Sequence, residues 1–358
     1  SNKTHHYTLT AWIDESYILP IKNETTTTKE TNKETYKFKV KVVGVDTPIT
    51  IKEKASTITL TNGALTLSKL TNNSNSSGLY TITHEADSTL QIGTNEDITE
   101  YRYRGASPKN YVTFNNEVWR ILGVFPVDDG TGNIEYRIKL IRNESIGNYY
   151  WNNCVDENND NICDVTNKTM NDWTWATLRA ELNRTYLNSL DSTSKSMIGN
   201  TKYYLGGKKV IWNEGIVDTP LQFYSYERKT QNTTSNEFYK GTNPNNWVGK
   251  VALMYLSDYG YASSNCENKR IYYTKASNYD IRACNGTNWL YNIKKTEWIL
   301  PQNPSFSNNA FSVYSDGNFN FYSVSSNQLA ARPVLYLISS AQITGGNGTS
   351  SSPYTLGI

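Results

Sequence analysis

The pattern of hydrophobic and polar positions predicts short strands along most of the chain. Apolar and polar residues alternate in Tyr7–Ile13 and again in Tyr36–Val42, where lysines occupy the polar positions. This alternation is typical of a strand with one buried face. A connection rich in Thr, Glu and Lys, about residues 22–35, separates the two segments. Because two strands are not a stable unit, we expect them to complete a sheet with other segments or with another chain.

Weaker strand signals follow in residues 46–98. The apolar and β-branched runs are Thr50–Lys52, Thr57–Leu60 and Leu79–Ile82. The stretch Thr71–Gly78 is rich in Asn and Ser, a composition typical of a loop or linker.

From residue 99 onward the chain carries clearer strand patterns. Two-residue turns are predicted at Asn115-Asn116 and Asp129-Gly130, since Asn and Gly tolerate the left-handed backbone that tight hairpins need. The strands predicted on either side of these turns are Glu100–Arg104, Tyr111–Phe114, Val118–Phe125 and Glu135–Ile141.

One longer helix is predicted over Asp172–Leu190, with Asp172 as its N-cap. A shorter helix is expected at Ser192–Ile198. The residues at helical spacing in the longer one are Trp175, Leu178, Leu182 and Tyr186. After Gly206-Gly207 the chain is expected to be mostly loops, before closing strands at Phe311–Tyr314, Phe319–Val324 and Arg332–Ile338.

This order of elements predicts an α+β fold of antiparallel strands with one or two helices. We divide the chain into an N-terminal β segment (residues 1–45), a β-rich connecting segment (46–98) and a larger module (99–358). The chain begins with Ser1 rather than Met, which indicates a processed or excised piece. It has no apolar run of 18 residues and no recognisable signal peptide, so we expect no transmembrane segment.

Composition adds little about partners and more about the core. The 35 Lys and Arg nearly balance the 33 Asp and Glu, which gives a formal net charge of +2. Such a balance provides no field to attract nucleic acid or an anionic membrane. The mean hydropathy of −0.61 would suit a disordered chain, but 27 Tyr and 9 Trp can each bury a large area. We therefore expect a folded protein with an aromatic core.

The four cysteines fall into two local pairs, Cys154 with Cys163 and Cys266 with Cys284. Neither pair has the spacing of a zinc or redox motif, and no His follows His84. Two local disulfides are therefore predicted, and persistent disulfides indicate a compartment outside the cytosol. The alternative is four buried free thiols.

Several motifs resemble poorly characterised surface modules of Gram-positive and related gut bacteria. The closing segment, with Ser315-Asp316-Gly317 followed by Arg332-Pro333-Val334, is similar to that of C-type-lectin-like domains related to formylglycine-generating enzymes. The other motifs are Glu100–Gly105, Asn110–Asn115, Val118–Gly123, Asn171–Trp173, Leu182-Asn183 and Tyr203–Gly207. The resemblance covers roughly residues 99–340.

The resemblance implies a C-type-lectin-like fold that is displayed outside the cell on a stalk or filament. The upstream strands resemble the end of a pilin-like or fibre-associated domain. Formylglycine-generating enzymes use a copper-binding cysteine pair near the C-terminus, whereas this chain has no cysteine after Cys284. The resemblance therefore implies the fold without the catalytic apparatus.

The segment between the first two cysteines predicts a calcium loop. Asp156, Asn158, Asp160 and Asp164 stand at positions 1, 3, 5 and 9 of an EF-hand-like loop, with the Ile162 carbonyl at position 7. Calcium prefers six to eight hard oxygen ligands, and this spacing can supply several. The loop lacks the bidentate Glu at position 12. The alternative is a solvated acidic hairpin tip that the disulfide holds.

Aromatic residues in the Asn-rich later loops suggest a surface for sugars, since aromatic faces stack on sugar rings. The alternative is that most of them form the core of a chain poor in Leu and Met. The candidates are Trp212, Trp247, Tyr259 and Trp289, with Tyr224, Tyr226, Tyr255 and Tyr261 nearby in sequence.

Catalytic interpretations find less support. His5, His6 and His84 all precede residue 99, so the module is expected to lack a histidine base. A carboxylate pair for glycoside hydrolysis is still available. Its candidates are Glu135, Asp218, Glu227 and Asp258.

Three functions follow from these patterns. The first is an extracellular structural or adhesive surface protein, a filament or pilus-like subunit that assembles with copies of itself or with neighbouring subunits. The second is a soluble module that binds a glycan or a host protein without assembly. The third is a carboxylate-dependent hydrolase. Exposed strand edges favour the first, because they invite strand addition from a neighbour.

Overall fold

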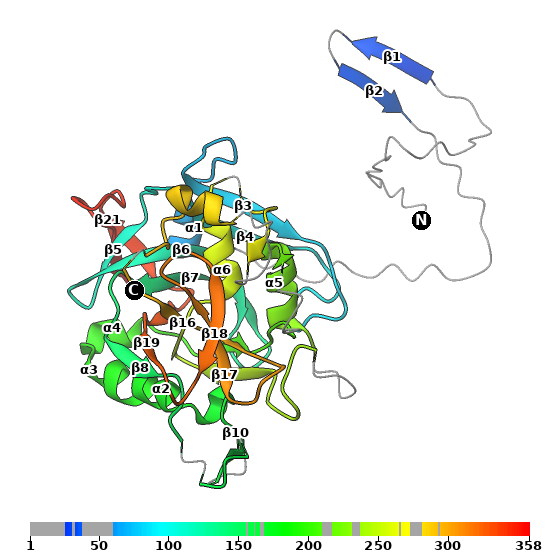
Figure 1. Cartoon of the computed structure of the whole chain (residues 1–358). Helices are drawn as coiled ribbons and strands as arrows, with labels where there is room; N and C mark the ends of the chain where they lie inside the picture. The colour runs from blue at the N-terminus through cyan, green and yellow to red at the C-terminus, as the bar shows by residue number, and fades with distance from the viewer. Residues whose placement is uncertain are drawn as a thin grey trace, which may run out of the picture. The chain divides into compact units, whose positions relative to one another are not determined.

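The chain divides into two compact units, Ser1–Ala55 and Ser56–Ile358, in a computed structural model (Figure 1). We describe each unit by itself. The described residues are 26–30, 33–37, 60–154, 157–160, 162–164, 168–209, 217–230, 237–264, 266–272, 281–292 and 294–358.

The first unit contains an antiparallel hairpin. Strand β1 (Thr26–Glu30) pairs with β2 (Lys33–Lys37), and Thr26 lies opposite Lys37. This hairpin occupies most of the segment that the sequence suggested was a connection, because β-branched threonines fit a strand well. The predicted strand Tyr7–Ile13 and most of Tyr36–Val42 lie outside the described residues.

The second unit is built on a seven-stranded antiparallel sheet with the order β14-β20-β7-β6-β4-β3, in which β5 also pairs with β6. Asn115 and Asn116 both have positive φ, 55° and 56°, as the predicted hairpin turn between β5 and β6 requires. The strands are β3 (Gly78–His84), β4 (Ile98–Arg104), β5 (Tyr111–Phe114), β6 (Glu117–Asp128), β7 (Ile134–Arg142), β14 (Val251–Ala252) and β20 (Val334–Tyr336).

The pairing of β3 with β4 joins residues on both sides of the domain boundary that the sequence suggested after residue 98. The two strands pair over their whole length, from Gly78 opposite Arg104 to His84 opposite Ile98. Strand pairing needs backbone partners from distant parts of the sequence, which a pattern of local composition does not reveal. The structure places residues 60–98 in the same compact unit as the residues that follow.

A second sheet has five strands in the order β18-β17-β16-β19-β8. Only β16 and β19 in it run parallel. Its strands are β8 (Asn148–Tyr150), β16 (Glu297–Gln302), β17 (Asn309–Val313), β18 (Phe319–Ser323) and β19 (Gln328–Ala330). The smaller pairs are β9 (Ile162–Cys163) with β10 (Lys168–Thr169), β11 (Thr201–Tyr204) with β13 (Asn246–Gly249), β12 (Val217–Asp218) with β15 (Ile271–Tyr272), and β21 (Gln342–Gly345) with β22 (Thr355–Gly357).

The helices are short and more numerous than the sequence suggested. Asp172 caps the predicted helical region, accepting a hydrogen bond from Thr174 N at 2.9 Å. That region consists of η1 (Trp173–Trp175), α2 (Thr177–Ala180), the π-helix η2 (Glu181–Tyr186) and α3 (Leu187–Ser189). The remaining helices are α1 (Asn62–Ser68), α4 (Ser192–Ser196), α5 (Pro220–Arg228), α6 (Leu256–Tyr261) and the 3₁₀-helix η3 (Ile281–Thr287). No helix in the described part of the chain is long and apolar enough to cross a membrane.

Helix α1 attaches the start of the second unit to its C-terminal hairpin. Gly63 N donates to Ala341 O at 2.9 Å, and Asn62 Nδ2 donates to Ser339 O at 3.0 Å. A Cβ at Gly63 would lie 2.7 Å from the Ala341 oxygen, so the contact requires glycine.

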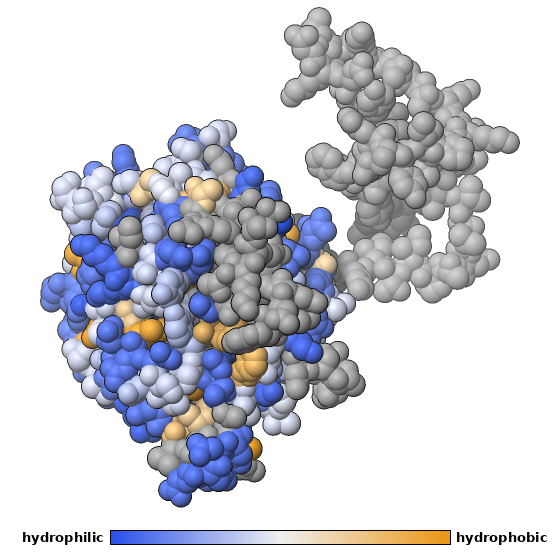
Figure 2. Space-filling model, in the orientation of Figure 1, coloured by the Kyte–Doolittle hydropathy of each residue, from blue (hydrophilic) through white to orange (hydrophobic). Residues whose placement is uncertain are grey.

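The core is aromatic, as the composition suggested. The side chains of Trp119, Trp151, Trp173 and Trp298 are all at most 1% exposed. The indoles of Trp151 and Trp173 contact each other, with ring centroids 5.1 Å apart. On the face drawn in Figure 2, hydrophilic residues predominate and hydrophobic ones are scattered. The fold is α+β with mostly antiparallel sheets and few helical residues, which confirms the predicted α+β class, while the C-type-lectin-like fold stays a prediction.

Candidate functional site

Both predicted cysteine pairs form disulfides. The Cα atoms of Cys154 and Cys163 are 5.7 Å apart, and those of Cys266 and Cys284 are 6.3 Å apart. Cys163, Cys266 and Cys284 are also buried among core residues. The bridges therefore join loops to the core of the second unit.

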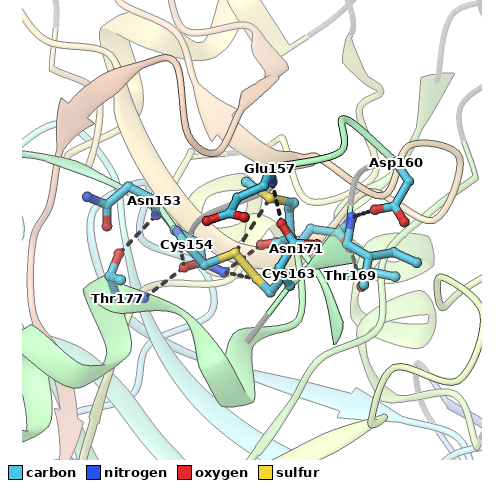
Figure 3. Close-up of a disulfide and its surroundings, with 12 residues drawn as sticks. Asn153, Cys154, Glu157, Asp160, Cys163, Thr169, Asn171 and Thr177 are labelled. Carbon is cyan, nitrogen blue, oxygen red and sulfur yellow. Dashed lines mark hydrogen bonds between the residues drawn. A yellow bond between two sulfur atoms is a disulfide. The ribbon is translucent and has the colours of Figure 1, made fainter. Parts of the chain in front are cut away.

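The predicted calcium loop lies within the first bridge (Figure 3). The Asp160 carboxylate accepts a hydrogen bond from Ile162 N at 2.9 Å, and Asp164 accepts one from Glu157 N. Asp156 lies outside the described residues, and Asn158 is exposed. Among the residues that the structure describes, no three His, Cys, Asp or Glu side chains gather as a metal site. Calcium binding here stays a prediction.

The aromatic candidates for sugar binding that the structure describes lie in or against the hydrophobic core. Tyr259 is fully buried, and Trp247 is partly buried against Tyr203, with ring centroids 5.7 Å apart. Trp289 donates its indole N–H to Tyr103 O at 2.8 Å. Trp212 lies outside the described residues. Four of the aromatic candidates are buried in the core: Tyr224, Tyr255, Tyr259 and Tyr261.

The four carboxylate candidates do not form an open pair. Glu135 bonds Arg137 and Ser339, and Asp218 accepts a hydrogen bond from the Tyr226 hydroxyl at 3.2 Å. The other two, Glu227 and Asp258, are 1% and 2% exposed. A hydrolase that used these two would have to open before a substrate could reach them.

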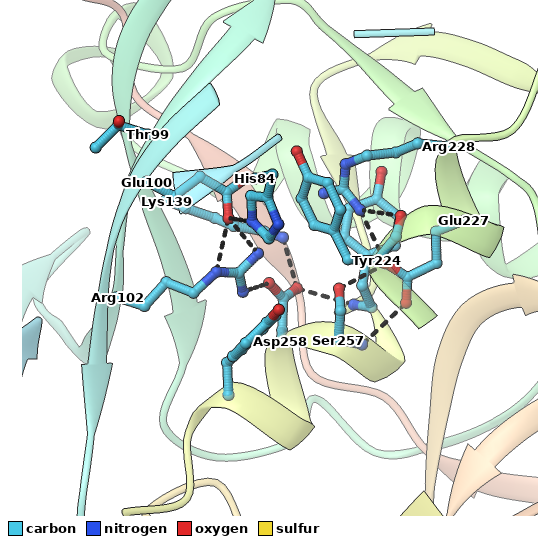
Figure 4. Close-up of polar contacts among 12 residues, drawn as sticks. His84, Thr99, Glu100, Arg102, Lys139, Tyr224, Glu227, Arg228, Ser257 and Asp258 are labelled. Atoms are coloured by element: carbon cyan, nitrogen blue, oxygen red, sulfur yellow. Dashed lines mark hydrogen bonds and ion pairs between the residues drawn. The ribbon is translucent and has the colours of Figure 1, made fainter. Parts of the chain in front are cut away.

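Glu227 and Asp258 belong to a cluster of buried charged residues, which we call the buried charge cluster (Figure 4). It lies between the β3–β4 end of the large sheet and helices α5 and α6. Its members, each at most 4% exposed, are His84, Glu100, Arg102, Lys139, Glu227, Arg228 and Asp258.

Asp258 is the centre of one half of this cluster. Its carboxylate accepts hydrogen bonds from Lys139 Nζ at 2.5 Å and from Arg102 Nη1 at 3.1 Å. Asp258 also caps α6 by accepting from Tyr255 N at 2.9 Å. Arg102 in turn donates to Glu100 at 2.8 Å. The carboxylate thus bonds two cations from β4 and β7, strands that β6 separates in the sheet.

The other half of the cluster ties α5 to α6. Glu227 accepts hydrogen bonds from Ser257 N at 2.9 Å and from Arg228 Nη1 at 3.0 Å. The Arg228 guanidinium lies over the Tyr224 ring, 3.7 Å from its centroid. Tyr224 stacks on His84, with centroids 3.6 Å apart and an interplanar angle of 4°. The aromatic ring therefore links the two halves.

The pKa values reflect this pairing. Burial alone would raise the pKa of Asp258, but Lys139 and Arg102 outweigh it and hold the pKa below its ordinary value. Burial lowers the pKa of Lys139 to about 8 against the opposing charge of Asp258. Burial raises the pKa of Glu227, although Arg228 opposes the shift. Charges this deep are stable only in pairs, because leaving one alone costs several kcal/mol.

His84 corrects one expectation from the sequence. We predicted that the module would contain no histidine, but β3 pairs with β4 and brings His84 Nε2 within 3.1 Å of Glu100. His84 lies before residue 99, outside the predicted module, and only the pairing of β3 with β4 brings it here. No pattern in the sequence pointed to Glu100, Arg102, Lys139 or Arg228 either.

The stability of the protein should decrease as pH falls below 6.5. Burial lowers the pKa of His84, and Glu100 only partly opposes this. At pH values between that lowered pKa and 6.5, His84 binds a proton in the unfolded chain but not in the folded chain. The free energy of unfolding therefore decreases as the pH decreases, by at most about 1.4 kcal/mol per pH unit. Urea unfolding between pH 7.5 and 5 measures the slope. His84→Gln, which does not titrate, should flatten it, and an unchanged slope would contradict the assignment to His84.

Two hollows flank the outer strand β3. One, of about 540 Å³, is lined by Thr83, His84, Leu221 and Tyr224, and the other, of about 410 Å³, by Tyr80, Thr83 and Leu221 among others. Both touch Thr83 and the 47% exposed side chain of Leu221 on α5. A groove therefore runs between the edge of the sheet and α5.

A third hollow, of about 220 Å³, lies between the outer strand β8 of the smaller sheet and the start of α2 and η2. We call it the β8 groove. Its polar and aromatic lining residues are Asn148, Tyr149, Tyr150, Asn153, Thr177, Glu181 and Gln328.

Comparisons with protein-family models, with curated proteins and with solved structures found no match for this chain.

Proposed function

We propose that this protein is an extracellular structural or adhesive surface protein, a filament or pilus-like subunit that displays its second unit, Ser56–Ile358, with a C-type-lectin-like fold. Its two disulfides suit an oxidising compartment. Its α+β architecture of mostly antiparallel strands suits a compact display module. The partner in assembly is another copy of this chain.

The outer edge of β3 carries this proposal. Its first half is covered, since Asn72 N donates to Leu79 O and the Asn73 side chain accepts from Thr81 N, both at 2.9 Å. Among the described residues, the backbone of Thr83 on the same outer edge has no hydrogen-bond partner. An exposed edge of this kind accepts an added strand, and the groove beside it can hold that strand's side chains.

Thr83→Pro is expected to weaken self-association. Proline removes the outward N–H that an added strand would use, and edge positions of this kind tolerate proline. We expect at least a tenfold weaker self-association constant by light scattering or sedimentation, with shorter assemblies in electron micrographs. Thr83→Val keeps the N–H and the β-branched shape, so it should associate like the parent chain.

Two results would count against assembly through this edge. One is a strict monomer at all concentrations for the parent chain. The other is association that survives Thr83→Pro while the melting temperature stays the same.

A second candidate function is a soluble module that binds a glycan or a protein without assembly. The β8 groove favours it, because its lining combines tyrosine rings with amide and carboxylate groups. The β8 groove and the β3 edge involve different sheets, so ligand binding and assembly can be tested separately.

A further inference from the structure

The β8 groove has a rigid frame. Trp298 Nε1 donates to Tyr149 O at 2.7 Å, and Trp151 Nε1 donates to Ile299 O at 3.2 Å. Both indoles are fully buried, so β8 is fixed against the core. On the helical side, Asn153 N donates to Thr177 Oγ1 at 3.2 Å. The two walls of the groove are therefore set before any ligand arrives, which lowers the cost of binding.

Most polar side chains of the groove have no hydrogen-bond partner within the described residues, and the exception is Thr177, whose hydroxyl accepts from Asn153 N. Within the described part of the chain, six of them make no hydrogen bond through their side chains, and these are Asn148, Tyr149, Tyr150, Asn153, Glu181 and Gln328. Elsewhere in this unit, Asn side chains often form hydrogen bonds with the backbone. Asn171 Nδ2, for example, donates to Asn303 O and Phe306 O, both at 2.9 Å. The groove instead presents donors, acceptors and ring faces together in one concave place.

From this arrangement we infer that the β8 groove is a binding site for a neutral carbohydrate. A sugar ring has an apolar face of C–H groups, which suits a tyrosine ring, and a rim of hydroxyls that both donate and accept. Side-chain amides can donate hydrogen bonds to such hydroxyls and accept them, and a carboxylate can accept them. The inference deepens the proposed surface function and rests on it only for its location outside the cell.

The charge of the lining selects the class of sugar. Glu181 is the one ionisable carboxylate among the groove's described lining residues, and no Lys or Arg lies among them. An anionic sugar would bring its own carboxylate or sulfate beside Glu181 without a cation to balance it. Burial and the negative charge of Glu181 also raise the pKa of Tyr149, so its hydroxyl stays a proton donor at neutral pH.

Titration calorimetry of the full chain against defined oligosaccharides tests the inference. The probes are neutral trimers of glucose, mannose and N-acetylglucosamine, with sialyllactose as the anionic comparison. We expect at least one neutral trimer to bind, and sialyllactose to bind at least tenfold more weakly. Tyr150→Ala and Glu181→Gln should each weaken binding of the neutral trimer tenfold or more.

Matched controls separate this site from the rest of the chain. Tyr314→Ala removes a tyrosine that is 37% exposed, directly follows β17 of the same sheet and lies outside the groove, so it should bind like the parent. Thermal unfolding verifies that each variant is folded. Binding should persist in EDTA, because no lining group requires a metal.

Three results would overturn the inference: no neutral trimer binds, the affinity for the trimer is the same in both groove variants as in the parent chain, or binding is lost in EDTA. Loss of binding in EDTA would indicate that the sugar binds at the predicted calcium loop instead. Self-association measured on the same samples reports on the proposed filament function independently, so the two proposals can fail separately.

Discussion

Asp258→Asn is expected to lower the free energy of unfolding by about 3–5 kcal/mol. The substitution leaves Lys139 and Arg102 buried without the carboxylate that now holds both, at 2.5 and 3.1 Å. Removing one partner of a buried pair costs more than the pair contributes, because the remaining charge loses its compensation. Urea or thermal unfolding of the purified protein measures the change.

Asp129→Asn provides the control, since Asp129 lies in an exposed turn and accepts hydrogen bonds from Thr131 N and Oγ1. Asparagine can form the same turn, so a change within about 0.5 kcal/mol is expected. Adding Lys139→Met to Asp258→Asn should recover part of the loss, because it removes the cation that loses its carboxylate, whereas Arg102 keeps Glu100. A loss below about 1 kcal/mol for Asp258→Asn alone would show that the buried charge cluster is not needed for stability.

Removing the Cys266–Cys284 bridge is expected to cost roughly 3 kcal/mol of stability. The bridge closes a segment with a sequence separation of 18, and opening it returns conformational freedom to the unfolded chain. The double variant Cys266→Ala/Cys284→Ala, measured by urea unfolding, tests this. The Cys154–Cys163 bridge closes a shorter segment, with a separation of 9. Removing it in Cys154→Ala/Cys163→Ala should therefore cost slightly less stability.

Reducing agent gives an independent test of the same bridges. Dithiothreitol should lower the melting temperature of the parent chain and leave a variant without all four cysteines unchanged. If the parent melts at the same temperature with and without reductant, the bridges contribute nothing to stability. Such a result would also weaken the argument for an oxidising compartment.

Much of the large sheet could be predicted because its signals are local. Strands β5, β6 and β7 alternate or run apolar over their own residues, and the turn at Asn115 and Asn116 is specified by those two residues alone. The cysteine pairs were predictable for the same reason, since each spans a short segment. These features need no knowledge of what packs against them.

The buried charge cluster could not be predicted, because its residues look like solvent-facing positions. Glu100 and Arg102 are spaced two apart on β4, a pattern that a half-exposed strand shares. Helices α5 and α6 cover that face, and only this covering makes the charges buried. The start of α5 did carry a usable signal, since Thr219 and Gln222 form a capping box around Pro220.

The candidate sugar site shows the same division. Aromatic content pointed toward stacking chemistry, but it could not say which rings would reach the surface. Tyr259 became core, whereas Tyr149 and Tyr150 line the β8 groove because β8 is the outer strand of its sheet. The edge position of a strand depends on the order of the sheet, which emerges only from the whole fold.

The contact between α1 and the C-terminal hairpin also affects how the second unit can be rearranged. Gly63 bonds Ala341, and the next residue, Gln342, lies opposite Gly357 at the chain's end. The first helix of the unit and its C-terminal hairpin therefore lie close together. A short linker could join them, and new termini could be opened at the Asn115-Asn116 turn, so that a circularly permuted chain would keep both sheets, since only a two-residue turn is opened.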